Sequence, residues 1–240
     1  MGRLKSGIWR RLALLGMGAL AVLKLHATFA MFLSMVVSVL IYAMPFGIWY
    51  AAGFVALLLA HEGGHVLASR VAGIGAGPPL FIPFLGAMVR LKRQPANAKV
   101  AANVALGGPA LGALSALACL AAYFWTEHLL LLALAYTAAL LNLFNLIPCD
   151  PLDGGQIAAA ISPYAWWGGS FLIGGLFFYT YNALIFVIFL FSLTRLWNVR
   201  ACGRTAYYRL SARQRMTVFW QYVGLIAVLG LVTLYIGELL

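Results

Sequence analysis

Two histidines and a glutamate have the spacing of a metal-dependent hydrolase inside an apolar stretch. The run HEGGH at residues 61–65 lies near the end of an almost wholly apolar segment at about 48–69. In an α-helix, residues i and i+4 share a face, so His61 and His65 can bind one metal ion while Glu62 reaches a water molecule beside it. Ionisable groups at bilayer depth are costly and usually mark a functional site. We therefore interpret this segment as a zinc hydrolase site within a membrane.

A third metal ligand has to come from a small set of acids. The chain has only five: Glu62, Glu127, Asp150, Asp153 and Glu238. Two of them lie in the run NLFNLIPCDPLDGG at residues 142–155, where two prolines and two glycines break the helix near membrane depth. Such irregular backbone is tolerated there only where protein or a wet cavity covers it. A carboxylate from this break, Asp150 or Asp153, would complete a two-histidine, one-carboxylate site with its fourth position open for water.

The composition indicates a protein that lies almost entirely in a membrane. Hydrophobic residues make up 64% of the 240 residues, charged residues make up 9%, and the mean hydropathy is +0.96. These values predict an all-α polytopic membrane protein. The net charge of +11 comes from 16 Lys and Arg, and it suits anionic lipids rather than nucleic acid. The three scattered cysteines, Cys119, Cys149 and Cys202, predict neither a disulfide framework nor a thiolate zinc cluster.

The apolar segments predict six to seven transmembrane helices. Beside the segment at 48–69, we expect spans at about 27–44, 102–124, 129–147 and 217–235. Residues 166–194 form either one span or a hairpin of two short helices that turns near 179–182. We expect residues 1–26 to form a cytoplasmic or interfacial amphipathic segment, because their apolar stretch is too short to cross the bilayer. Residues 27–240 are then a single membrane domain with a three-helix catalytic core at about 48–160.

The charges orient the predicted helices. Basic residues gather between the second and third spans, and again in the loop 195–215. By the positive-inside rule both loops are cytoplasmic, which favours the hairpin for 166–194. We interpret the arginines of 195–215 as a lipid-facing, topology-setting loop. His61 lies about 20 Å along its helix from the outer surface, and therefore about 10 Å from the cytoplasmic face.

At these residues the chain resembles the site-2 protease family of intramembrane zinc metalloproteases. That family pairs HExxH on one helix with an Asn-x-x-Pro and Asp-Gly stretch on a later one. The resemblance implies that Asp153 is the third zinc ligand and that Asn145 donates a hydrogen bond to the substrate or the oxyanion. It also matches the run GGP at 107–109 to the head of the family's third core helix. Relatives often have Asn after this Gly-Pro, whereas this chain has Gly112.

Residues 73–91 separate the second and third spans and are rich in proline. Pro78, Pro79 and Pro83 forbid a regular helix, and short runs capable of β-structure flank them. We expect a short membrane-associated β or re-entrant segment. An exposed strand edge could hold an unwound substrate by β-augmentation. The alternative is a connecting loop that dips into the lipid headgroups.

These features predict an intramembrane zinc endopeptidase. We expect Zn²⁺ to be held by His61, His65 and, as the resemblance implies, Asp153. We expect Glu62 to be the general base, and the resemblance implies that Asn145 stabilises the oxyanion. The resemblance implies a single-pass membrane protein as substrate and a bacterial plasma membrane as location; the sequence identifies no regulatory partner. The alternative is a catalytically silent scaffold or chaperone. A zinc transporter would need polar relays across the whole bilayer, and the outer two-thirds of this bundle lacks them.

Overall fold

The computed structural model describes residues 26–84, 86–197, 199 and 205–239. The expected interfacial segment 1–26 lies outside the described residues except for His26, and so do Arg200 and Arg204. The helices are His26–Phe46, α2 Ile48–Val71, α3 Ala98–Thr126, α4 Leu129–Asn145, α5 Asp153–Ile161, α6 Ala165–Thr180, α7 Ala183–Leu196 and α9 Ala212–Gly237, with a short 3₁₀ turn η1 Ala206–Tyr208. The strands are β1 Leu80–Ile82 and β2 Gly86–Met88.

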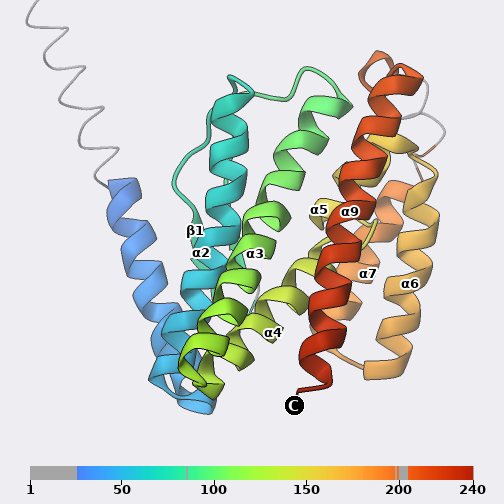
Figure 1. The fold of residues 1–240 in the computed structure, drawn as a ribbon. Helices are drawn as coiled ribbons and strands as arrows, with labels where there is room; N and C mark the ends of the chain where they lie inside the picture. The colour runs from blue at the N-terminus through green and yellow to red at the C-terminus, as the bar shows by residue number, and fades with distance from the viewer. Residues whose placement is uncertain (1–25, 85, 198, 200–204, 240) are drawn as a thin grey trace, which may run out of the picture.

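The described residues form a helical bundle with one small β-hairpin, which confirms the expected fold class (Figure 1). Among these residues, four helices are long and apolar enough to cross a membrane: the helix His26–Phe46, α2, α3 and α9. The helices α4, α6 and α7 are shorter, with 17, 16 and 14 residues. The chain is an integral membrane protein in which four long helices accompany several shorter ones.

Helix α3 lies at the centre and packs against α2, α4, α5 and α9. Its contact with α2 is made by glycines, because a Cβ built on Gly64 would lie 2.0 Å from the carbonyl oxygen of Gly107. In lipid, helices associate through close packing of small residues rather than through a hydrophobic driving force. These two glycines bring the backbone of α3 against the helix that carries the histidines.

The run GGP at 107–109 lies in the middle of α3, so its expected place at the head of this helix is wrong. Helix α3 begins four residues earlier than expected because the Asn97 side chain accepts a hydrogen bond from the Val100 backbone N–H. This N-cap stabilises a first turn at Ala98. Pro109 is then inside the helix.

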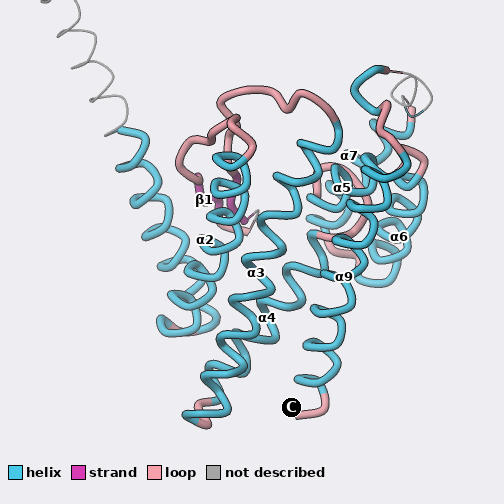
Figure 2. The backbone as a smooth tube through the Cα atoms, turned by 45° about the horizontal axis from the view of Figure 1, so that its top comes forward, coloured by secondary structure: helices cyan, strands magenta, loops and turns pink. Residues whose placement is uncertain are grey.

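Residues 166–194 form a hairpin of two helices, as the positions of the basic loops predicted. Helix α6 ends at Tyr181, which adopts a left-handed conformation with φ of 50°. The side chain of Asn182 then accepts hydrogen bonds from the N–H groups of Leu184 and Ile185 and starts α7. The turn returns the chain to its starting end, so the start of α9 and the end of α2 lie at the same end of the bundle (Figures 1 and 2).

Residues 73–91 contain the expected β-structure rather than an irregular connecting loop. Strands β1 and β2 pair antiparallel, with Phe81 opposite Ala87. Two side chains of the helix His26–Phe46 accept hydrogen bonds from this hairpin: Ser34 Oγ from the Phe81 N–H at 3.2 Å, and Tyr42 Oη from the Phe84 N–H at 2.8 Å. The helix His26–Phe46 thus lies along the outer edge of β1, and no further strand pairs with the other edge, that of β2, among the described residues.

Candidate metal centre

The histidines His61 and His65 lie one turn apart on α2 and point across Gly108 of α3. A Cβ built on Gly108 would lie 2.3 Å from His65 Nε2 and 2.9 Å from His61 Nε2. Any side chain at this position would therefore fill the space in front of both imidazoles. The glycine allows the two Nε2 atoms to share one open site.

Asp153 reaches this site because the chain breaks between α4 and α5. Helix α4 ends at Asn145, before Pro148, and Asp153 is the first residue of α5. The break is tight: a Cβ on Gly154 would lie 2.2 Å from the Leu146 carbonyl oxygen. The buried Trp166 side chain donates a hydrogen bond of 2.8 Å to the Gly155 carbonyl and secures the other side. The glycines after Asp153 are thus needed for the close return of the chain.

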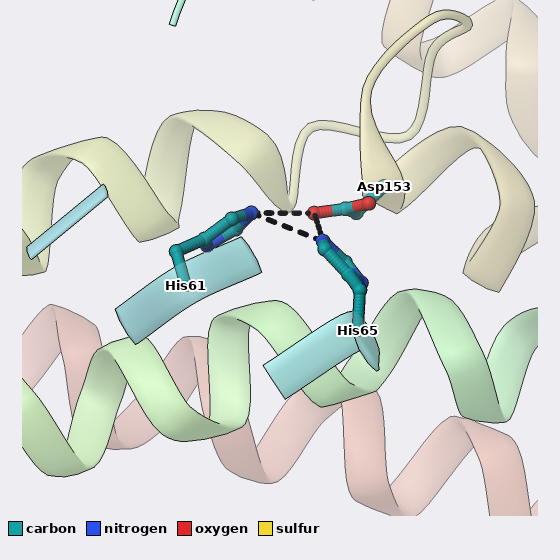
Figure 3. A group of neighbouring side chains, drawn as sticks. All are labelled: His61, His65 and Asp153. Carbon is teal, nitrogen blue, oxygen red and sulfur yellow. Dashed lines mark hydrogen bonds and ion pairs between the residues drawn. The ribbon is translucent and has the colours of Figure 1, made fainter. Parts of the chain in front are cut away.

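Three potential ligand atoms meet at the centre of the site (Figure 3). The distance between His61 Nε2 and His65 Nε2 is 3.2 Å. Asp153 Oδ2 lies 3.2 Å from His61 Nε2 and 3.3 Å from His65 Nε2. The three atoms form a nearly equilateral triangle, although α2 and the start of α5 are about 90 residues apart in the sequence.

The hydrogen bonds at the far side of each ring determine the tautomers. His65 Nδ1 lies 2.8 Å from the Val104 carbonyl oxygen, which only accepts, so Nδ1 carries the hydrogen. His61 Nδ1 lies 2.8 Å from Asn142 Oδ1, and Asn142 Nδ2 donates to the Ala138 carbonyl, which fixes the orientation of the amide. Both neutral rings therefore direct an Nε2 lone pair at the Asp153 carboxylate. A divalent cation between these three acceptors would satisfy all of them at once.

The geometry of this triangle fits a zinc ion. Tetrahedral zinc binds nitrogen and oxygen at about 2.0–2.1 Å, which places its ligand atoms about 3.3 Å apart. The observed separations of 3.2–3.3 Å match this value. Two imidazoles and one carboxylate are also the donor set of catalytic zinc sites that keep a fourth position open.

The two remaining predicted site residues lie outside this triangle. Glu62 is buried next to His61 on α2, with 5% of its surface exposed, and its carboxylate is not in the group of mutually close ligand atoms. Asn145 is the last residue of α4 and is partly exposed. The structure therefore brings together His61, His65 and Asp153, and places Glu62 beside them.

Asp150, the alternative ligand, has another partner. Its Oδ2 lies 3.0 Å from Arg195 Nε, and it is not in the group with the histidines. The interpretation of the arginines of 195–215 as a lipid-facing loop is also wrong for two of them. Arg195 pairs with Asp150 and stacks over the Trp166 ring, and Arg215 donates to backbone carbonyls of α5. Both make specific contacts within the protein because unpaired carbonyls and carboxylates near the membrane need donors.

Sequence reasoning missed Asn142, which holds His61. Asn142 is 1% exposed, and its side chain occupies the space left by Gly112: a Cβ there would lie 2.1 Å from Asn142 Oδ1. The glycine that stands where relatives often have Asn thus makes room for an amide from α4. The signal was present, since Asn142 is a strongly polar residue inside a mostly apolar helix, one turn before the break.

Two proteins named as zinc metalloproteases are similar to this chain in sequence. The chain is 31% identical over 147 residues to the zinc metalloprotease MJ0392 of Methanocaldococcus jannaschii. This alignment covers 58% of this chain and 42% of that protein. The chain is also 36% identical over 124 residues to the putative zinc metalloprotease Rip3 of Mycobacterium tuberculosis. This second alignment covers 48% of this chain and 30% of that protein. The chain thus matches less than half the length of these relatives.

One solved structure also aligns with this chain. The site-2 protease from Methanocaldococcus jannaschii aligns with a TM-score of 0.46 and 18% sequence identity, over 73% of this chain and 89% of that chain. No family model matches the chain.

Proposed function

We propose that this chain is an intramembrane zinc endopeptidase of the site-2 protease family, which hydrolyses peptide bonds in or near transmembrane segments of membrane-anchored proteins. The observation that carries this proposal is the triangle of His61 Nε2, His65 Nε2 and Asp153 Oδ2, whose histidines lie on α2, a helix long and apolar enough to cross a membrane. The similarity to two proteins named as zinc metalloproteases supports it.

Each residue of the site has a separate task. His61, His65 and Asp153 hold the ion, which when bound lowers the pKa of a water molecule and polarises a carbonyl group. The Glu62 carboxylate accepts the proton of the attacking water and returns it to the leaving amine. Asn145, partly exposed at the end of α4, donates a hydrogen bond to the oxyanion. The Asn142 amide and the Val104 carbonyl keep both imidazoles in the reactive tautomer.

We place the site nearer the cytoplasmic face of a bacterial plasma membrane. His65 lies six residues before Val71, the last residue of α2, which is about 9 Å along the helix axis. The basic loops at this end of the bundle favour the cytoplasm and its anionic lipids. Water then has a short path to the site from the cytosol.

The substrate we propose is a single-pass membrane protein whose helix unwinds before cleavage. The edge of β2 with which no further strand pairs among the described residues can pair with the unwound chain, because main-chain hydrogen bonds need no particular side chains. Strand β2 also packs against α2, which carries the histidines. The cut peptide bond would thus lie beside the site in an extended conformation.

A cleavage assay tests this proposal. The purified chain, loaded with zinc in detergent, should cleave an unstructured membrane peptide. The Glu62→Gln variant should bind zinc equally and lose about 100-fold or more of the rate, since it lacks the base. In cells carrying this variant, single-pass proteins should accumulate uncut. Zinc-loaded native protein that cleaves no such peptide, with no accumulation in cells, would favour the silent scaffold instead.

A further inference from the structure

Helix α9 contacts both ends of the segment that presents Asp153. Arg215 and Tyr222 lie seven residues apart on one face of α9, about 10 Å along its axis. The nine residues of α5 span about 13 Å. The two side chains of α9 are therefore spaced to reach the start of the break before α5 and the last turn of α5.

Tyr222 supplies a donor at the end of α4. Its hydroxyl donates a hydrogen bond to the carbonyl of Leu146, the C-cap residue of α4, and the ring is 9% exposed. The last carbonyls of a helix have no partner within the helix, and lipid offers none. The same Leu146 oxygen lies against Gly154, the residue after Asp153. Tyr222 thus holds the Leu146 carbonyl, and the backbone at Gly154, next to Asp153, packs against this same carbonyl.

Arg215 supplies donors at the other end. Its guanidinium donates to the carbonyls of Ala160 and Ile161 in the last turn of α5, and to the Tyr208 carbonyl at 2.8 Å. A cation at this position interacts favourably with the negative end of the α5 dipole. Val218, between Arg215 and Tyr222 on the same face, is completely buried. This face of α9 therefore packs against α5 between the two polar contacts.

We infer that Arg215 and Tyr222 are positioning residues that set the place of the Asp153 carboxylate relative to the two histidines. This inference rests on the proposed zinc site. Asp153 is the first residue of α5, so any shift of α5 along α9 moves its carboxylate directly. A metal site requires its ligands to stay within about 0.5 Å of the productive geometry. The last helix, although it contributes no ligand, thus belongs to the functional unit.

Zinc competition against a chelating dye tests the inference on the full chain in detergent. For Tyr222→Phe and Arg215→Gln we expect zinc affinity to fall about three- to tenfold, less than the 10–100-fold typical of groups bonded directly to a ligand. Arg215→Lys should recover part of this loss, because it keeps the charge and one donor group. For peptide cleavage by the zinc-loaded variants, kcat should fall while KM stays near its native value.

Matched variants on the same helix serve as controls. Tyr235→Phe removes a hydroxyl from a partly exposed ring, and Arg213→Gln removes an exposed guanidinium two residues from Arg215. Neither should change zinc affinity. If Tyr222→Phe and Arg215→Gln lower thermal stability but bind zinc as tightly as the native chain, the inference is wrong while the proposed function stands. If the native chain itself binds no zinc, both are wrong.

Discussion

At the residue scale, the metal site depends on its candidate ligands and equally on the groups that hydrogen-bond to them. His61 and His65 each use Nδ1 for a hydrogen bond, to the Asn142 amide and the Val104 carbonyl. These bonds fix which nitrogen carries the hydrogen, and they leave both Nε2 lone pairs for a cation. A side chain that touches no substrate can thus control metal affinity.

Two asparagines one turn apart on α4 allow a direct test of which residues affect zinc binding and which affect the rate of cleavage. Asn142→Leu leaves the His61 Nδ1–H buried and unpaired, so we expect zinc affinity to fall about 10–100-fold. Asn145→Leu should leave zinc affinity unchanged and lower kcat, because the proposed role of Asn145 is to donate a hydrogen bond to the oxyanion. Isothermal titration with zinc and cleavage kinetics measure the two effects. Equal zinc affinity in the native chain and Asn142→Leu would contradict the assignment.

At the element scale, the crossing of α2 and α3 positions the histidines. The backbones touch at Gly64 and Gly107, and the imidazoles lie over Gly108 one residue further on. Because each close neighbour of Gly64 is backbone, rotating a side chain cannot relieve a methyl group added there. Helices α2 and α3 can therefore approach this closely only because both have glycine at the crossing.

Neighbouring glycines of α2 give a matched pair for this crossing. In Gly64→Ala the new Cβ would lie 2.0 Å from the Gly107 oxygen, so we expect a loss of stability of about 1–3 kcal/mol as the helices separate. In Gly63→Ala the nearest atom, Leu111 Cδ2, would be 3.8 Å away, and the better helix propensity of alanine should stabilise the chain by about 0.5–1 kcal/mol. Thermal unfolding in detergent measures both. A stable Gly64→Ala variant would rule out the close crossing.

At the scale of the whole molecule, the α6–α7 hairpin decides the topology. It returns the chain to the end at which α2 finishes, so α7 ends and α9 begins at that same end (Figure 1). A single span over 166–194 would put the end of α2 and the start of α9 on opposite sides. The hairpin also places Arg195, at the end of α7, next to Asp150 in the break before α5.

Cysteine labelling in intact cells tests this arrangement. In a variant without the native cysteines, single cysteines at the exposed positions Arg93, Arg209 and His128 report the two ends of the bundle. We expect a membrane-impermeant thiol reagent to label His128→Cys and to label neither Arg93→Cys nor Arg209→Cys until the membrane is opened. Labelling of Arg209→Cys from outside would exclude the hairpin topology.

Much of this protein follows from local signals in the sequence. Apolar runs of bilayer length predict the helices, since a backbone in lipid must satisfy its hydrogen bonds internally. The i, i+4 histidines predict one metal site, and the run of prolines and glycines at 148–155 predicts the break after α4. The hairpin at 166–194 follows from the distribution of charge. Even the misplaced start of α3 had a local signal, the Asn97 N-cap.

Only the tertiary structure decided which side chains serve the site. Asp150 and Asp153 are both acids of one break, and their separate partners, Arg195 and the two histidines, come from distant helices. The roles of Asn142 and Arg215 likewise depend on contacts between elements that are far apart in the chain. The spacing of residues along one helix determines which of them share a face. Which neighbour that face meets depends on how the helices pack.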